Sequence, residues 1–258
     1  SRQLVIESPQ GRRVAPLADI DRVVIISGGA SITSRVLRVL ARYGVDLLVL
    51  DGRGVPIVSL SPPWITATVD TRRGQYLAYT NPERALSIAR SFAVAKILNQ
   101  ASYIRYLAHS LGARELLEEA EKIQEQAQHI YAITGPLNDA RKRIMGIEGT
   151  AARIYWSAIA TVLPKSAGFS SRDQDGVDPF NRCLNYLYGV LYAEVFRALV
   201  KHGLDPYAGY LHVDRSGKPV LSFDFIEMFR VSAVDSLLVR MFRDGFEAGG
   251  DERGYLSR

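Results

Sequence analysis

The pattern of apolar and polar residues changes near residue 70 and divides the chain into two parts. Before that point, short runs rich in Val, Ile and Leu alternate with turn residues, which is typical of β-strands. These runs are "QLVIES" at 3–8, "RRVAPL" at 12–17, "DRVVIIS" at 21–27, "VDLLVL" at 45–50 and "VPIVSL" at 55–60. The last two runs flank the turn "DGRG" and are predicted to form a hairpin. Residues 28–44 are predicted to form a short helix, and "SPPW" at 61–64 breaks the pattern because proline disfavours further pairing.

From residue 71 onwards, apolar residues recur every three or four positions, which is the period of an α-helix. The predicted helices cover 82–110, 114–133, 135–163, 178–192 and 225–242, and residues 212–224 are predicted to be strand-like around a Ser-Gly turn. Asn81 and Asp178 are expected to cap helices that begin with Pro82 and Pro179. The sequence therefore predicts an α+β protein, with a small, mostly β N-terminal domain at 1–70 and a larger all-α domain at 71–258.

The composition excludes several classes of protein and leaves others open. The chain has 258 residues, of which 47% are hydrophobic, and no apolar run approaches the roughly 20 residues of a membrane span. The first residues lack the apolar core of a signal peptide, so we expect a cytoplasmic protein. Cys183 is the single cysteine, which excludes an internal disulfide and a zinc site of several thiolates. The net charge of +5, supplied mostly by arginine, permits nucleic-acid binding without establishing it.

A polar stripe runs along the predicted helix at 178–192. Asp178, Asn181, Asn185, Tyr188 and Tyr192 follow one another at spacings of three and four residues, so they share one helix face. A plain solvated face would use Glu, Lys and Gln, and asparagine is a poor helix former. Buried Asn and Tyr side chains need hydrogen-bond partners. The stripe is therefore predicted to line a polar cavity or to contact a polar ligand.

Candidate chemistry rests on carboxylates and histidine. The sequence has no G-x-x-x-x-G-K-[ST] loop, no nucleophile elbow and no H-E-x-x-H motif. His212 lies between two apolar residues shortly before Asp224 and Glu227, whose spacing of three directs both carboxylates to one side of a helix start. An imidazole and these carboxylates could hold a divalent ion if a tight turn brings them together.

Glu148 is a third candidate, because it interrupts an apolar segment and is followed by small residues that allow close approach to the backbone. Arg141 lies seven residues before it and Tyr155 seven residues after it, on the same helix face. The alternative interpretation of these three residues is a surface salt bridge beside an aromatic ring.

In combination, these segments resemble the CRISPR adaptation integrases, the metal-dependent, nuclease-like proteins that insert new spacers. The resemblance covers nearly the whole chain. It is carried by "LARYGVDLLVLDGRG", "RRGQY…ARSFAVAKILNQ", "GIEGTAARIYW", "DPFNRCLNYLYGVLY" and "KHGLDPYAGYLHVDRSGKPVLSFDFIEMFR", with Asp235 just after. Each segment is modest evidence alone, but five in the family's order are specific.

The resemblance implies a metal bound by Glu148, His212 and Glu227, with Asp224 at a further acidic position beside it, and these four are the predicted catalytic residues. Many relatives have Asp where this chain has Glu227, and the longer side chain keeps the charge. Two carboxylates and one imidazole suit Mg²⁺ or Mn²⁺. The resemblance also implies that residues 1–70 form a homodimer and that residues 71–258 are catalytic.

The activity implied is insertion of protospacer DNA into a CRISPR array, by attack of a 3′-hydroxyl on a phosphodiester. The implied partners are double-stranded DNA, as protospacer and as CRISPR repeat, and the small adaptation protein that bridges two integrase dimers. The predicted nucleic-acid contacts are Arg141, Lys142, Arg143, Tyr155, Asn181, Asn185, Lys218 and Arg230. Two alternatives remain open at this point: a stand-alone repair nuclease for branched DNA, and a catalytically inactive DNA-binding assembly subunit.

Overall fold

The computed structural model of the chain describes residues 3–9, 11–26, 29–50, 56–60 and 69–249. The chain forms two compact units, Ser1–Thr66 and Ala67–Arg258. Three predicted features lie outside the described residues: the turn at 51–54, the break at 61–64 and the end of the chain from residue 250. The small β region and the helical region that follows it confirm the predicted fold class.

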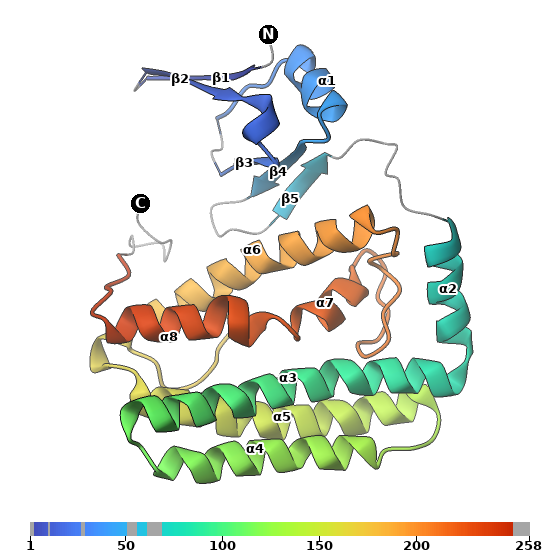
Figure 1. Cartoon of the computed structure of the whole chain (residues 1–258), viewed down its shortest axis with the longest axis vertical. Helices are drawn as coiled ribbons and strands as arrows, with labels where there is room; N and C mark the ends of the chain where they lie inside the picture. Colours follow the sequence, from blue (N-terminus) through green and yellow to red (C-terminus); the bar gives the residue numbers. More distant parts are fainter. Residues whose placement is uncertain (1–2, 10, 27–28, 51–55, 61–68, 250–258) are drawn as a thin grey trace. The chain divides into compact units, whose positions relative to one another are not determined.

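The described residues of the N-terminal unit form two small sheets and one α-helix (Figure 1). Strands β1 (Gln3–Ser8) and β2 (Gly11–Pro16) pair antiparallel, and β4 (Asp46–Leu50) pairs parallel with β3 (Arg22–Ile25) and antiparallel with β5 (Pro56–Leu60). The β4–β5 pair confirms the predicted hairpin strands. A short 3₁₀ turn (Leu17–Asp19) and α1 (Ser34–Arg42) complete the unit, whose core is formed by Leu17, Leu40, Val45 and Leu47.

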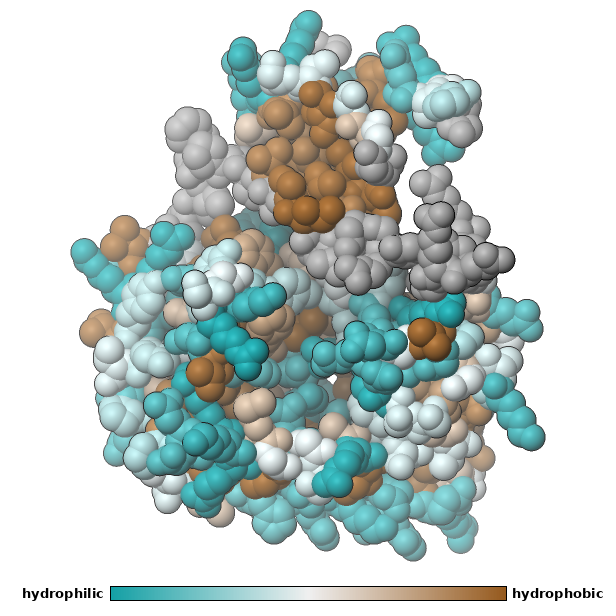
Figure 2. Space-filling model, turned by 180° about the vertical axis from the view of Figure 1, so that it is seen from behind, coloured by the Kyte–Doolittle hydropathy of each residue, from teal (hydrophilic) through white to brown (hydrophobic). Residues whose placement is uncertain are grey.

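This small core leaves many apolar side chains of the strands in contact with solvent. Val24, Ile57 and Leu60 are among the exposed residues. Figure 2 shows that apolar side chains gather on one face of the N-terminal unit. Contiguous exposed apolar patches are uncommon on monomeric proteins and are typical of surfaces that contact other molecules.

The helical unit begins with α2 (Val69–Thr80) and then forms a bundle of three long helices, α3 (Pro82–Leu111), α4 (Glu115–Tyr131) and α5 (Leu137–Val162). These three pack side by side, as Figure 1 shows. Asn81 caps α3 through a 3.0 Å hydrogen bond from the backbone N–H of Arg84, as predicted. No described helix combines the length and the apolar character that crossing a membrane requires.

A second group of helices lies against α3 and α5 and holds most of the polar side chains of interest. It consists of a 3₁₀ turn (Lys165–Ala167), α6 (Pro179–Lys201), α7 (Val220–Ile226), a π-helical turn (Val231–Asp235) and α8 (Ser236–Arg243). Asp178 caps α6 as predicted, because its Oδ1 accepts the backbone N–H of Asn181 at 2.9 Å.

Two predictions for this part of the chain are wrong. Residues 212–224 form no strand; loop and turn are followed by α7, which begins just after Pro219. The carboxylate of Asp224 binds the backbone N–H groups of residues 210–212, so these groups have a side-chain partner instead of a strand. The predicted helix at 225–242 is also interrupted, because a turn at 227–229 follows α7, and the π-helical turn then continues directly into α8.

Candidate metal centre and its surroundings

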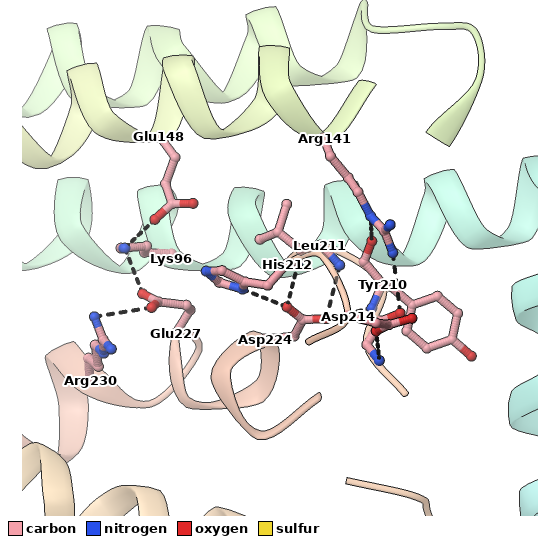
Figure 3. A network of polar contacts seen from close by, with 11 residues as sticks. Lys96, Arg141, Glu148, Tyr210, Leu211, His212, Asp214, Asp224, Glu227 and Arg230 are labelled. Carbon is pink, nitrogen blue, oxygen red and sulfur yellow. Dashed lines mark hydrogen bonds and ion pairs between the residues drawn. The ribbon is translucent and has the colours of Figure 1, made fainter. Parts of the chain in front are cut away.

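Two carboxylates from different helices converge on the ammonium group of Lys96 (Figure 3). Glu148 extends from the middle of α5, Glu227 directly follows α7, and Lys96 lies in the middle of α3. The Nζ atom of Lys96 is 2.6 Å from Oε2 of Glu227 and forms a short contact with Oε1 of Glu148. Lys96 is 9% exposed and Glu227 is 4% exposed, so the pair with Glu227 is buried.

A second cation binds the other oxygen of Glu227. The Nη1 atom of Arg230 lies 3.0 Å from Oε1 of Glu227. Burial raises the pKa of Glu227, but the charges of Lys96 and Arg230 outweigh this effect and hold the pKa below its usual value. Burial lowers the pKa of Lys96, whereas Glu227 and Glu148 raise it, and the net pKa is raised. The cluster is therefore a set of charged groups that stabilise one another.

Asp224 fixes the loop that presents His212. Its Oδ2 accepts the N–H groups of Tyr210 and Leu211 at 2.6 and 2.9 Å, and its Oδ1 accepts the N–H of His212 at 2.9 Å. The same Oδ1 lies 2.7 Å from Nδ1 of the His212 ring. Asp224 is fully buried, so a carboxylate with four contacts replaces the hydrogen bonds that this loop would otherwise make to water.

The ring of His212 is held with its second nitrogen directed toward Lys96 and Glu227 (Figure 3). Burial lowers the pKa of His212, but the hydrogen bond and charge of Asp224, together with Glu227 and Glu148, raise it above its ordinary value. A carboxylate that binds one ring nitrogen of a histidine orients the other nitrogen for ligation. Asp224 thus has the geometry of a group that supports His212.

The donor chemistry of this cluster fits a divalent cation. Two carboxylates already surround one positive charge, the Lys96 ammonium, and an imidazole nitrogen faces the same point. Oε2 of Glu227 is buried and has no hydrogen bond of normal geometry apart from the ion pair with Lys96. Among the described residues, however, no three His, Cys, Asp or Glu side chains converge closely enough to form a complete cation site. The predicted ligands lie together around a lysine that the sequence analysis had not singled out.

Arg141, a predicted phosphate contact, has a structural position instead. It is 2% exposed, and its Nε and Nη2 donate to the backbone carbonyls of Tyr210 and Gly209 at 2.6 and 3.4 Å. A guanidinium buried against carbonyl groups cannot reach a DNA phosphate. The prediction for Arg141 is therefore corrected: it anchors the loop that carries His212.

Tyr155 and Asn181 are likewise buried, at 0% and 1% exposure, and are not available to DNA in this structure. The amide of Asn181 binds the backbone of Ser171 and Asp173 and the side chain of Asp178. Asn185, which is half-buried, accepts from Arg172 at 2.6 Å and donates to the carbonyl of Gln174 at 2.8 Å. Most of the polar stripe on α6 therefore holds the loop at 171–174, because that loop supplies the partners that buried amides require.

Of the two remaining stripe residues, Tyr192 stacks on the ring of Phe223, and Tyr188 belongs to a buried carboxylate network. Asp235 accepts hydrogen bonds from Tyr188 at 2.6 Å and from Tyr155 at 2.9 Å. Burial raises the pKa of Asp235 to about 6, although these two hydrogen bonds and the nearby cations oppose the shift. The guanidinium of Arg230 lies over the ring of Tyr188, 4.6 Å from its centroid.

A pocket of about 480 Å³ adjoins the cluster. Its lining is rich in cations and aromatic rings and includes Lys96, Arg153, Trp156, Arg172, Tyr188 and Arg230. Lys96, Arg172 and the pocket were missed at the sequence level. One signal was available for Lys96: the charged residue interrupts the apolar run "FAVAKIL" in a strongly periodic helix. The other predicted cations Lys142, Arg143 and Lys218 are exposed, and Arg230 is half-buried.

Comparison with known proteins places these features in one family. The family model of the CRISPR associated protein Cas1 matches residues 1–250. The curated "CRISPR-associated endonuclease Cas1 1" of Pyrobaculum aerophilum is 40% identical over 242 residues, which is 92% of this chain and 76% of that protein.

Two solved structures share the fold. A casposase bound to integration product has a TM-score of 0.77 and 27% identity, over 95% of this chain and 68% of that one. A Cas1 protein from Thermotoga maritima has a TM-score of 0.81 over 99% of this chain and 79% of its own. At 19% identity, the latter comparison supports the fold alone.

Proposed function

Because this chain belongs to the Cas1 family of CRISPR-associated endonucleases, we propose that it is a metal-dependent DNA endonuclease and integrase. In this proposal it inserts protospacer DNA into a CRISPR array. The observation that carries the proposal is the convergence of Glu148 and Glu227 on one cation, with a ring nitrogen of His212 facing the same point. The similarity to a casposase bound to integration product supports strand transfer as the reaction.

Glu148, Glu227 and His212 are the proposed ligands of Mg²⁺ or Mn²⁺, and Asp224 is proposed to hold His212. When bound, such an ion polarises a phosphodiester and offsets the charge that develops on its oxygens. Asp224 keeps one ring nitrogen of His212 occupied, so the other is free to act as a ligand. Arg230, ion-paired to Glu227, limits the movement of that carboxylate.

The proposed reaction is an in-line substitution at phosphorus. The oxygen of a protospacer 3′-hydroxyl forms a bond to the phosphorus of a repeat phosphodiester, and the bond to the 3′-oxygen of the repeat strand breaks. The attacking hydroxyl loses one proton and the leaving oxygen gains one, so the exchange is balanced. If water attacks instead, the product is a nick, which is the endonuclease reaction named in the relatives.

The exposed cations Lys142, Arg143 and Lys218, together with half-buried Arg230, are the proposed phosphate contacts. Such contacts position the duplex but carry no base specificity. Binding through them releases counter-ions, so affinity is expected to fall steeply as the salt concentration rises.

The proposed assembly follows from the family. Residues 1–70 are proposed to form a homodimer, which is supported by the exposed apolar face of the N-terminal unit, and residues 71–258 to be catalytic. The small CRISPR-associated adaptation protein is proposed to bridge two such dimers on DNA, and the assembly is expected to act in the cytoplasm. Light scattering of the purified chain alone tests dimer formation, and light scattering with the partner protein tests whether that protein bridges two dimers.

The experiment that tests the function combines the purified protein with Mn²⁺, a labelled duplex with 3′-hydroxyl ends and a supercoiled plasmid carrying a CRISPR array. Label joined to the plasmid supports integration, and a duplex with 3′-deoxy ends must abolish that product. Nicking without joining, also lost in the Glu148→Gln variant, indicates a nuclease only. Metal-independent binding with neither product indicates an inactive assembly subunit and overturns the proposal.

A further inference from the structure

Lys96 holds the position between the carboxylates that a metal ion needs. Its Nζ lies 2.6 Å from Oε2 of Glu227 and in short contact with Oε1 of Glu148, and its side chain is 11% exposed. Two carboxylates buried side by side repel one another and require a positive charge between them. Lys96 provides that charge from within the chain.

The ammonium group and a divalent ion cannot share this position. Both are cations, and repulsion between charges a few ångströms apart is strong away from bulk water. We infer that Lys96 is an exchangeable counter-ion: it neutralises Glu148 and Glu227 in the metal-free protein and is displaced when a divalent ion binds them. This inference rests on the proposed function, because it takes Glu148 and Glu227 as the metal ligands.

The structure also provides a place for the displaced ammonium. Lys96 lines the pocket of about 480 Å³ that adjoins the cluster, and Gln100 lines the same pocket. Gln100 is 3% exposed, and its Oε1 is buried without a hydrogen-bond partner. Residues four apart on a helix lie on one face, so Lys96 can turn along α3 and donate to this oxygen. A buried acceptor without a donor is costly, which makes Gln100 a specific second position for the ammonium.

The first experiment measures Mn²⁺ binding to the full chain by calorimetry, at fixed pH and salt. Lys96→Met removes the competing charge, so Mn²⁺ is expected to bind at least about tenfold more tightly than to the wild type, within the usual range of coupling between sites. In EDTA this variant is expected to melt at a lower temperature than the wild type. Mn²⁺ is expected to raise the melting temperature of the variant by more than it raises that of the wild type. Lys122→Met is the matched control, because Lys122 forms an exposed pair with Glu119 away from this cluster.

A second comparison tests whether Gln100 binds the displaced ammonium group of Lys96. Gln100→Leu is expected to weaken Mn²⁺ binding in the wild type, because the displaced ammonium loses its acceptor. In the Lys96→Met background the same change is expected to have little effect, and the double-mutant cycle measures that difference. Equal effects of Gln100→Leu in both backgrounds would overturn the role of Gln100.

A labelling measurement on the wild type avoids any failure of the variants to fold. Modification of Lys96 by an amine reagent, read by mass spectrometry against Lys122, is expected to increase several-fold when Mn²⁺ is bound. Unchanged labelling with Mn²⁺ bound, or no tighter binding to folded Lys96→Met, overturns the inference. If the wild type binds no Mn²⁺ at all, the proposed metal centre fails instead, so the two outcomes are distinguishable.

Discussion

The guanidinium of Arg141 donates a 2.6 Å hydrogen bond to the backbone carbonyl of Tyr210, two residues before His212. Arg141 lies on α5, the helix that also carries Glu148. One helix therefore positions a proposed metal ligand directly and a second one through the loop at 209–212. Movement of the loop at 209–212 relative to α5 would change the distance between Glu148 and His212. The proposed chemistry requires that distance to be fixed.

Replacing Arg141 tests this anchoring role. Arg141→Ala is expected to lower the free energy of unfolding by roughly 3 kcal/mol, because it leaves the buried carbonyl of Tyr210 without a donor. Strand joining and Mn²⁺ affinity are both expected to fall. Arg143→Ala, on the exposed side of the same helix, is expected to change stability by less than about 0.5 kcal/mol and to reduce the salt dependence of DNA binding. Urea unfolding measures the stability of both variants, and DNA binding at several salt concentrations measures their salt dependence. If Arg141→Ala has unchanged stability and a weaker salt dependence of DNA binding, Arg141 is a phosphate contact after all.

The contrast between these two arginines shows what the sequence could and could not predict. Periodicity and capping residues predict α3 and α6, because each helix is specified by its own residues, such as Asn81 with Pro82 and Asp178 with Pro179. The burial of Arg141 depends on a loop 69 residues away, and no local pattern distinguishes it from Arg143. The strand-like prediction for 212–224 is wrong for a similar reason, since the backbone N–H of His212 is bound by the side chain of Asp224, which no local pattern indicates.

The candidate site shows the same division. Glu148, His212 and Glu227 were predicted mainly through a resemblance. Spacing alone left a surface salt bridge as the alternative for Glu148, and it could not show whether a turn brings His212 and Glu227 together. Lys96 was missed, since a lysine in an apolar helix indicates only that a partner exists. Its two partners lie 52 and 131 residues further along the chain.

The two proposed carboxylate ligands are expected to differ in their effect on stability. Glu227 is paired with both Lys96 and Arg230, and its side chain is 5% exposed, so Glu227→Gln is expected to cost about 3 kcal/mol. Glu148 has a 13% exposed side chain paired with Lys96 alone, and Glu148→Gln is expected to cost about 1 kcal/mol. Both variants are expected to lose joining and nicking. Denaturant unfolding in EDTA measures the difference; equal stabilities of the two variants would show that Arg230 does not contribute to holding Glu227.

Asp235 is expected to produce a pH dependence of stability. Burial raises its pKa from 3.8 to about 6, so the folded protein binds this proton more tightly than the unfolded chain does. Between these two pH values the unfolded chain has lost the proton and the folded protein keeps it, so the contribution of Asp235 to the free energy of unfolding falls as pH rises. The total loss is on the order of 3 kcal/mol and is complete above about pH 6.

Asp235→Asn isolates this contribution. The amide oxygen can accept from one tyrosine hydroxyl and the amide nitrogen can donate to the other, so contacts with Tyr155 and Tyr188 are retained. Relative to the wild type, the variant is expected to gain stability as pH rises from about 4 to 6 and to keep that gain at pH 7. Urea unfolding of both proteins at several pH values gives the difference curve. A flat curve would show that Asp235 ionises in the folded protein as readily as in the unfolded chain.

Gln75 of α2 binds the chain just before His212 from the other side. Its Nε2 donates to the carbonyls of Asp205 and Ala208 at 2.9 and 3.0 Å, and its Oε1 accepts the N–H of Asp205 at 2.8 Å. Its own backbone carbonyl accepts the hydroxyl of Tyr210 at 2.8 Å. Gln75 is 5% exposed, so removing its side chain leaves buried backbone groups of Asp205 and Ala208 without their protein partner.

We expect Gln75→Ala to destabilise the protein by about 2 kcal/mol and to release the segment at 205–210. If that segment positions His212, the His212 ring moves away from Asp224, its raised pKa shifts toward the ordinary value of 6.5, and Mn²⁺ binds more weakly. Nuclear magnetic resonance of the histidine rings measures the pKa, and Gln128→Ala, at an exposed position of α4, is the matched control. A folded Gln75→Ala protein with an unchanged His212 titration would mean that Asp224 alone holds the ring, because its contacts with residues 210–212 do not involve α2.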